Sequence, residues 1–255
     1  MRSATARPRR VASLLLTAVL GSGCASFYEV PIETPLQSKL DVAAFRRIMI
    51  AGFVTEPGAE ADIDLSAETV RLLQNQLRTS TKLQVLEPDR PPLQDALAVV
   101  RTRLEEGTGR LNKAGQERYA LEADRVLEDA DFWRRLGEEY QTPLIVTGRI
   151  GFGEQNRSGF QAGERVVSTP SGTRRVTENR YIERKGFSLS ADFFFIDGRS
   201  GQTLHKEKFT EEVLYGEEQR ISPLSSYFEL MDRLLPNFLG VITPQKIRGT
   251  RVLLQ

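Results

Sequence analysis

The sequence predicts an α/β fold: a mixed sheet of about five strands flanked by helices, with a helical insertion and a long polar β-hairpin arm. Three observations predict it. An apolar run at 46–53 is followed by an amphipathic helix and a second short strand at 82–88, the order of a right-handed crossover between parallel strands. A further helix leads into an apolar segment at 142–152. Alternating apolar residues at 187–195 then precede an Asp-Gly turn, which is typical of an antiparallel hairpin.

The first strand and helix follow from their apolar residues. RRIMIAGF at 46–53 is largely apolar, as a strand buried on both faces requires. In the next helix Ser66 is predicted as the N-cap, and Val70, Leu73 and Leu77 lie on one face.

Residues 91–130 are charged and favour helix, although Gly107 and Gly109 interrupt the pattern. We interpret this segment as a helical insertion whose charges form a solvated face. Asp131 is then predicted to cap a helix that leads into the third strand, and a last amphipathic helix begins at Ser222.

Residues 1–23 are predicted to be a signal peptide. The first ten residues contain four arginines and no acidic residue, and an uninterrupted apolar run follows at 11–20. A helix of that length is about 15 Å long, roughly half of the ~30 Å hydrocarbon core, so it is too short for a permanent membrane span. The segment is therefore expected to be removed.

Cys24, the only cysteine, directly follows Gly-Ser-Gly at 21–23. This arrangement resembles the lipobox of bacterial lipoproteins, in which the new N-terminal cysteine is acylated. Gly21 stands where that family usually has Leu, so ordinary signal-peptidase cleavage at Gly-Ser-Gly is an alternative. Ala25 and Ser26 stand where an Asp tends to retain lipoproteins at the inner membrane. The resemblance therefore implies a lipid anchor in the outer membrane, on the periplasmic side.

The remaining chain is predicted to form a tether, one domain and a tail. Residues 24–44 are the lipidated N-terminus and an extended spacer, 45–242 are a periplasmic α/β domain, and 243–255 are a C-terminal tail. Without the four arginines of the signal peptide, 31 basic and 34 acidic residues remain. This slightly acidic balance argues against nucleic acid as a partner.

The order strand, helix, strand, helix, strand, hairpin, helix resembles a periplasmic α/β domain found in several lipoproteins. It is carried by RRIMIAGF, KLQVLEP, FWRRLGEEYQTPLIVTGRI and DFFFIDGRSGQTLHKEKF. The group includes the curli-secretion channel lipoprotein, the lipoprotein activators of penicillin-binding proteins and the N-terminal domain of the Tol-Pal system's TolB. The resemblance covers about residues 45–242 without the insertion. It implies a domain that binds other proteins and does not catalyse a reaction.

The sequence predicts no catalytic, metal or cofactor site. His205 is the only histidine, so a histidine-based metal site or catalytic triad would depend on one residue in a charged edge strand. GRIGFG at 148–153 lacks the spacing of a phosphate-binding loop. An enzyme whose carboxylates converge from distant parts of the chain is the less favoured alternative.

The arm, residues 154–185, is predicted to be a docking surface. It contains seven basic and four acidic residues, with the turn-like sequence STPSGT near its centre. Its candidate partner-binding residues are Arg174, Arg175, Arg180 and Tyr181, because arginine and tyrosine are enriched at binding hot spots. A hairpin whose charges only keep it soluble is the alternative. Neither face of the hairpin is apolar, so the sequence predicts no transmembrane pore.

The sequence therefore predicts a membrane-anchored lipoprotein of the cell envelope that acts as a protein-binding adapter or activator, not as an enzyme. Its expected partner is a periplasmic or envelope protein, or an anionic envelope polymer. A subunit of an oligomeric secretion or envelope assembly is the alternative function, since the oligomeric state does not follow from the sequence.

Overall fold

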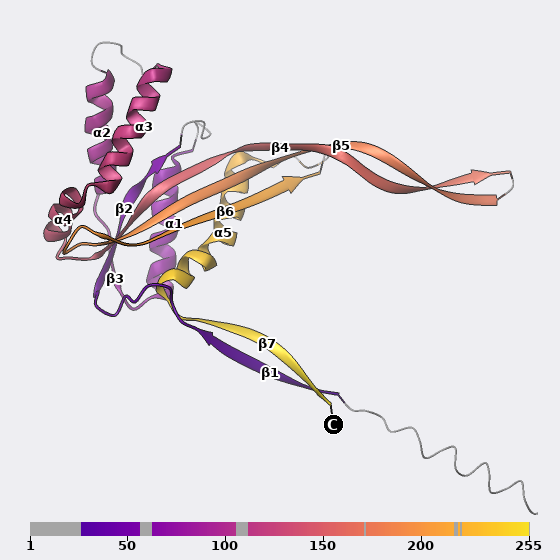
Figure 1. Cartoon of the computed structure of the whole chain (residues 1–255), viewed down its shortest axis with the longest axis horizontal. Helices are drawn as coiled ribbons and strands as arrows, with labels where there is room; N and C mark the ends of the chain where they lie inside the picture. Colours follow the sequence, from indigo (N-terminus) through magenta and orange to yellow (C-terminus); the bar gives the residue numbers. More distant parts are fainter. Residues whose placement is uncertain are drawn as a thin grey trace, which may run out of the picture. The chain divides into compact units, whose positions relative to one another are not determined.

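The computed structural model describes residues 27–56, 63–105, 112–170, 172–216, 219 and 221–254 (Figure 1). The predicted signal peptide and Cys24 lie outside these ranges. The chain divides into two compact units. The larger unit is Gln37–Thr243, and the smaller unit combines the residues up to Leu36 with those from Pro244 onward.

The larger unit is built on a five-stranded mixed sheet in the order β3-β2-β4-β5-β6. β2 is parallel to β3 and to β4, whereas β4 with β5 and β5 with β6 are antiparallel. The strands are β2 Arg47–Thr55, β3 Gln84–Leu86, β4 Leu144–Thr169, β5 Gly172–Asp197 and β6 Thr203–Tyr215. This sheet and the five described helices confirm the predicted fold class, including the helical insertion and the long polar arm.

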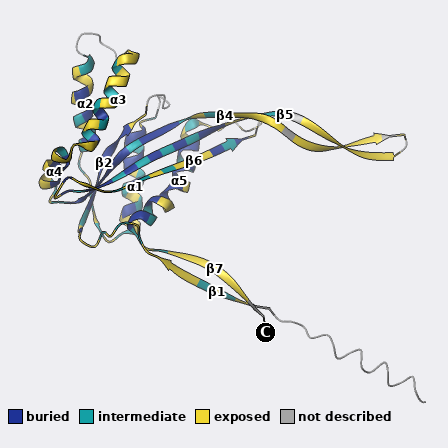
Figure 2. Ribbon diagram, viewed as in Figure 1, coloured by how far each residue is buried: buried dark blue, intermediate teal, exposed yellow. Residues whose placement is uncertain are grey.

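Helices cover both faces of the sheet because its central strands are apolar on both sides. Along β2, Ile48 and Ile50 face one core, and Met49 and Ala51 face the other. The first core packs against α1 and α5, and the second against α2, α3 and α4 (Figure 2). The helices are α1 Leu65–Ser80, α2 Pro92–Glu105, α3 Lys113–Glu128, α4 Ala130–Glu139 and α5 Pro223–Ile242.

The helical insertion supplies part of the second core and is not only a solvated face. Leu93 and Leu97 of α2 are buried together with Ala123 and Leu127 of α3 and with Trp133 of α4. Trp133 also donates a hydrogen bond from its indole nitrogen to the carbonyl oxygen of Leu127, at 3.0 Å. The insertion therefore helps to close one side of the domain, while its charged residues lie on the outward helix surfaces.

Two helix N-caps differ from the predicted ones. Asp64 caps α1 in place of Ser66, and Asp129 caps α4 in place of Asp131. Each aspartate accepts a hydrogen bond from the backbone N–H three residues later, at 3.0 Å. Ser66 lies in the first turn, where its buried hydroxyl accepts a bond from the Phe53 N–H. In both helices two capping residues stand two positions apart, so residue type alone cannot fix the boundary.

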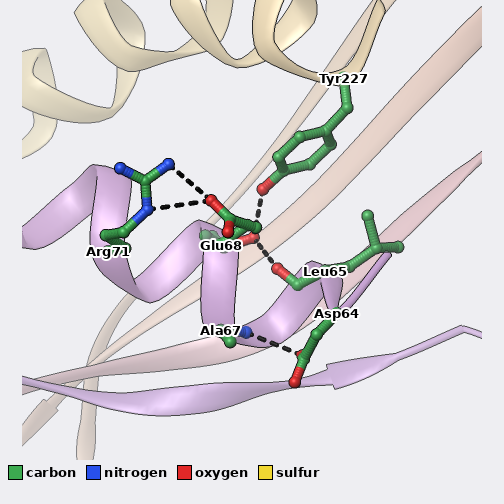
Figure 3. A network of polar contacts seen from close by, with 7 residues as sticks. Asp64, Leu65, Ala67, Glu68, Arg71 and Tyr227 are labelled. Carbon is green, nitrogen blue, oxygen red and sulfur yellow. Dashed lines mark hydrogen bonds and ion pairs between the residues drawn. The ribbon is translucent and has the colours of Figure 1, made fainter. Parts of the chain in front are cut away.

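A buried pair of hydroxyl groups joins α1 to α5 (Figure 3). The Tyr227 hydroxyl lies 2.8 Å from the Thr69 hydroxyl, which donates its own proton to the Leu65 carbonyl at 2.5 Å. Because the threonine has only one hydroxyl proton, Tyr227 is the donor to Thr69. Burial raises the pKa of Tyr227, so the phenol stays protonated. On the same helix, Arg71 pairs with Glu68 at 2.6 Å.

Replacing Tyr227 with phenylalanine should lower the free energy of unfolding by about 1 kcal/mol, because one buried hydrogen bond is lost while the ring still packs. Urea unfolding followed by circular dichroism measures the change. The matched control is Tyr181→Phe, at a half-exposed ring, which should change the free energy of unfolding by less than about 0.5 kcal/mol. Equal values for the two variants would contradict a stabilising role for the Tyr227 hydroxyl.

The smaller unit contains a two-stranded antiparallel ribbon of β1 Phe27–Leu36 and β7 Gln245–Leu254. Its ten residue pairs run from Phe27 opposite Leu254 to Leu36 opposite Gln245. These strands lie in the predicted tether, residues 24–44, and tail, residues 243–255, for which no pairing is predicted. Their pairing joins the two ends of the chain, which no local sequence pattern indicates.

Candidate docking site on the hairpin arm

The arm, residues 154–185, is the part of β4 and β5 that continues past the edge of the other strands (Figure 1). β6 pairs with β5 only as far as Tyr215 opposite Lys185, so the arm has two strands beyond that pair. The two strands stay paired to Thr169 opposite Gly172, whose φ of +128° favours glycine. Most of the arm is exposed (Figure 2).

The structure does not bring the four predicted binding residues onto one face of the arm. Side chains alternate between the two faces along a strand. Arg174 and Arg180 therefore belong to one face, and Arg175 and Tyr181 belong to the other. The side chain of Arg180 lies outside the described residues, and the other three side chains are exposed. A flat partner surface could therefore contact Tyr181 and Arg175 together, but not Arg174 at the same time.

Tyr181 forms an exposed aromatic pair with Phe160, the residue directly opposite it on β4. The ring centroids are 5.4 Å apart and the ring planes meet at 66°. Phe160 is 77% exposed and Tyr181 is 50% exposed. Phe160 is not among the residues predicted from the sequence. The register of the hairpin identifies it, because counting outward in both directions from the predicted turn places Phe160 opposite Tyr181.

Cross-strand ion pairs neutralise part of the positive charge of the arm. Arg175 lies 3.7 Å from Glu164, and Arg165 lies 3.8 Å from Glu178. All four side chains are largely exposed, so each pair contributes less than about 1 kcal/mol to stability. With seven basic and four acidic residues, the arm keeps a surplus of positive charge after such pairing.

An open groove of about 370 Å³ lies at the base of the arm, and Phe160 is among its lining residues. Ile182 and Arg184 alternate with Tyr181 along β5, so their side chains lie on the face of the arm opposite the two rings. A β-carbon on Gly159 would meet no atom within 4 Å, which agrees with an open groove at this position, and Ile182 stands opposite. The full lining is Arg157, Ser158, Gly159, Phe160, Ile182, Arg184 and Leu214. The groove therefore combines aliphatic and aromatic surface with two guanidinium groups.

The other titratable groups of interest lie at the edge of the sheet. His205 of β6 lies 2.9 Å from Glu207, which also forms a hydrogen-bonded ion pair with Lys39. The hydrogen bond from Lys39 is the main cause that lowers the pKa of Glu207. Among the described residues, no group of three His, Cys, Asp or Glu side chains could hold a metal ion. Within the same ranges, none of the helices has the length and apolar character of a membrane span. The expectation that the protein is not an enzyme stays a prediction.

Comparison with known proteins gives a distant similarity to a curated protein. No protein-family model matches the chain. A stretch of 112 residues is 31% identical to a UPF0246 protein of Burkholderia multivorans (strain ATCC 17616 / 249) and covers 44% of this chain. The chain spans 36% of the length of that curated relative.

This similarity corrects the predicted relationship to the periplasmic lipoprotein domains. This curated relative is named UPF0246 protein and is not a lipoprotein of that group, so the predicted relationship is wrong. The resemblance depended on the order of strands and helices. That order is a weak guide to relationship, because a small set of α/β arrangements recurs in unrelated proteins.

Proposed function

We propose that this chain is a membrane-anchored, protein-binding adapter of the cell envelope. In this proposal a lipid on Cys24 holds the protein at the outer membrane, on the periplasmic side, and the arm binds a protein partner. The observation that carries the proposal is the exposed aromatic pair of Phe160 and Tyr181 on the arm.

An exposed aromatic pair of this kind supports binding more strongly than a single exposed apolar residue, which is common on any protein surface. Aromatic residues and arginine are enriched in protein interfaces and at hot spots. On the opposite face of the arm, Ile182 and Leu214 of the groove suit an apolar side chain of the partner, whereas the guanidinium of Arg157 already lies 2.6 Å from Glu212. The partner segment that fits the rings themselves has an aliphatic or aromatic side chain.

The predicted arginines Arg174, Arg175 and Arg180 have a different role in this proposal. They lie on both faces of the arm, so they attract an acidic partner from either side. Exposed charges of this kind mainly raise the association rate, and their effect weakens with salt over a Debye length of about 8 Å at physiological ionic strength. The two rings then provide most of the contact.

Replacing Phe160 and Tyr181 together with serine should lower partner capture at least tenfold, because both rings are exposed and available to an interface. The free energy of unfolding should change by less than about 1 kcal/mol. Capture is measured with a photo-crosslinking phenylalanine analogue at Asn179, an exposed position on the same face of the arm as Tyr181, in intact cells. Mass spectrometry then identifies the crosslinked protein.

The matched control is Val99→Ser on α2, which removes an apolar side chain that is 69% exposed and should leave the crosslink unchanged. Replacing Arg174, Arg175 and Arg180 with serine should slow capture and reduce its dependence on salt. If no discrete protein is crosslinked, or if the crosslink survives removal of both rings, the arm is only a solvated hairpin. Binding of the purified protein to anionic envelope polymer without any protein adduct would favour the polymer as the partner.

A further inference from the structure

The outer edge of β1 is closed to further strand pairing. Pro31 and Pro35 lie four residues apart, so their backbone nitrogens face the same side of the strand. Proline has no N–H to donate, and in a sheet it is found where that group would face away from the neighbouring strand. The backbone nitrogens of Pro31 and Pro35 therefore face outward from the ribbon. The outer edge of β1 lacks the two N–H donors that other residues would provide there.

The same alternation leaves the outer edge of β7 open. Pro31 is opposite Thr250 and Pro35 is opposite Lys246, so the backbone groups of Thr250 and Lys246 also face outward. β7 contains no proline, and among the described residues it pairs only with β1. A two-stranded ribbon is marginally stable in water, and an open edge is a template for another strand.

The sequence of β7 is compatible with pairing to itself in an antiparallel register centred on Thr250. In that register Lys246 is opposite Leu254 of a second copy, Arg248 is opposite Val252, and Thr250 is opposite its own equivalent. No two like charges are opposite each other. A shift of two residues toward the N-terminus would place Arg248 opposite Arg248, which is destabilising. A shift of two residues the other way would shorten the pairing.

The face of the ribbon that carries Glu33 suits this register. On it Glu33 already pairs with Lys246 and Arg248, at 3.2 and 3.1 Å, which neutralises part of the positive charge of β7. On the other face Arg251 is opposite Gly249 of the second copy and diagonal to the second Arg251. The register thus places no like charges directly opposite each other, and the diagonal pair of arginines is the like-charge contact that it keeps.

We infer that β7 pairs with β7 of a second copy, so that two ribbons form a four-stranded sheet with a twofold axis at Thr250. Such an interface is isologous, since the same strand contributes on both sides. It is independent of the lipid anchor and of the arm, and it supports the alternative in which the protein is a subunit of an oligomeric assembly.

Disulfide trapping tests the register directly. The full chain carries Cys24→Ser, so that an introduced cysteine is the only thiol, together with either Thr250→Cys or Lys246→Cys. Hydrogen-bonded partners in an antiparallel pair have Cα atoms about 5.5 Å apart, within the range of a disulfide. The two copies of residue 246 would be about 27 Å apart. Thr250→Cys should therefore give at least tenfold more oxidised dimer than Lys246→Cys.

Sedimentation of the same Cys24→Ser protein gives a second measurement. Thr250→Pro removes an outward N–H at the centre of the interface and should convert the dimer to monomer. Glu29→Pro, at an outward position of the closed β1 edge, should leave the dimer intact. A monomeric starting protein, or equal trapping at residues 250 and 246, would overturn the inference. Because neither measurement uses the lipid or the arm, failure here leaves the proposed function standing.

Discussion

Replacing Trp133 with alanine should lower the free energy of unfolding by about 3 to 5 kcal/mol. The indole is 1% exposed and lies in the core between the sheet and the helices α2, α3 and α4. Its loss leaves a cavity that the neighbouring side chains fill only in part, and it removes the hydrogen bond to the Leu127 carbonyl. Urea unfolding followed by far-ultraviolet circular dichroism measures the change without depending on the lost indole fluorescence.

Two variants separate the causes of that loss. Trp133→Phe keeps much of the ring volume but loses the hydrogen bond, so it should cost about 1 to 3 kcal/mol. Leu121→Ala on α3 removes a side chain that is 62% exposed and should change the free energy of unfolding by less than about 0.5 kcal/mol. A loss below about 1 kcal/mol for Trp133→Ala would mean that the insertion is not part of the cooperative core.

Replacing Cys24 with serine should move the protein from the membrane fraction to the soluble periplasmic fraction. Each buried methylene of an attached chain contributes about 0.8 kcal/mol, so two or three acyl chains hold a protein firmly and their absence releases it. Fractionation of cells that produce each form measures the shift.

Ser26→Ala is the control for the Cys24 variant, because it changes a neighbouring residue and leaves the cysteine in place. Its distribution between fractions should match that of the unmodified protein. Mass spectrometry of the mature N-terminus also distinguishes an acylated cysteine from ordinary cleavage at Gly-Ser-Gly. Retention of Cys24→Ser in the membrane fraction would contradict lipid anchoring.

Most of the larger unit could be predicted because burial leaves a local pattern. The strand at 46–53 is apolar throughout its centre, and the strand at 187–195 alternates, since one is covered on two faces and the other mainly on one. The pairing of β1 with β7 left no such pattern. Its partners come from opposite ends of the chain, and the choice of partner depends on tertiary structure. The burial of Leu93 and Leu97 was similarly hidden by the charges around them.

Residues of the candidate site could be predicted from the sequence only where the residue type alone indicated a binding role. Tyr181 stands out as an aromatic residue in a polar hairpin, but Phe160 required the register of two strands. The assignment of Arg174 and Arg175 to opposite faces follows from the period of two along a strand. The groove joins residues of β4, β5 and β6, so it too required the register of the strands.

The β1–β7 ribbon also determines what a label at the end of the chain would report. β7 ends with Leu254 opposite Phe27, where β1 begins, and Cys24 is only three residues earlier. Three residues of any conformation span at most about 10 Å. With a lipid on Cys24, an affinity tag fused after Gln255 would lie close to the lipid headgroups, where antibodies and resins have poor access. Immunodetection through such a tag would underestimate the protein in intact membranes, and a fluorophore in the same place would respond to lipid packing.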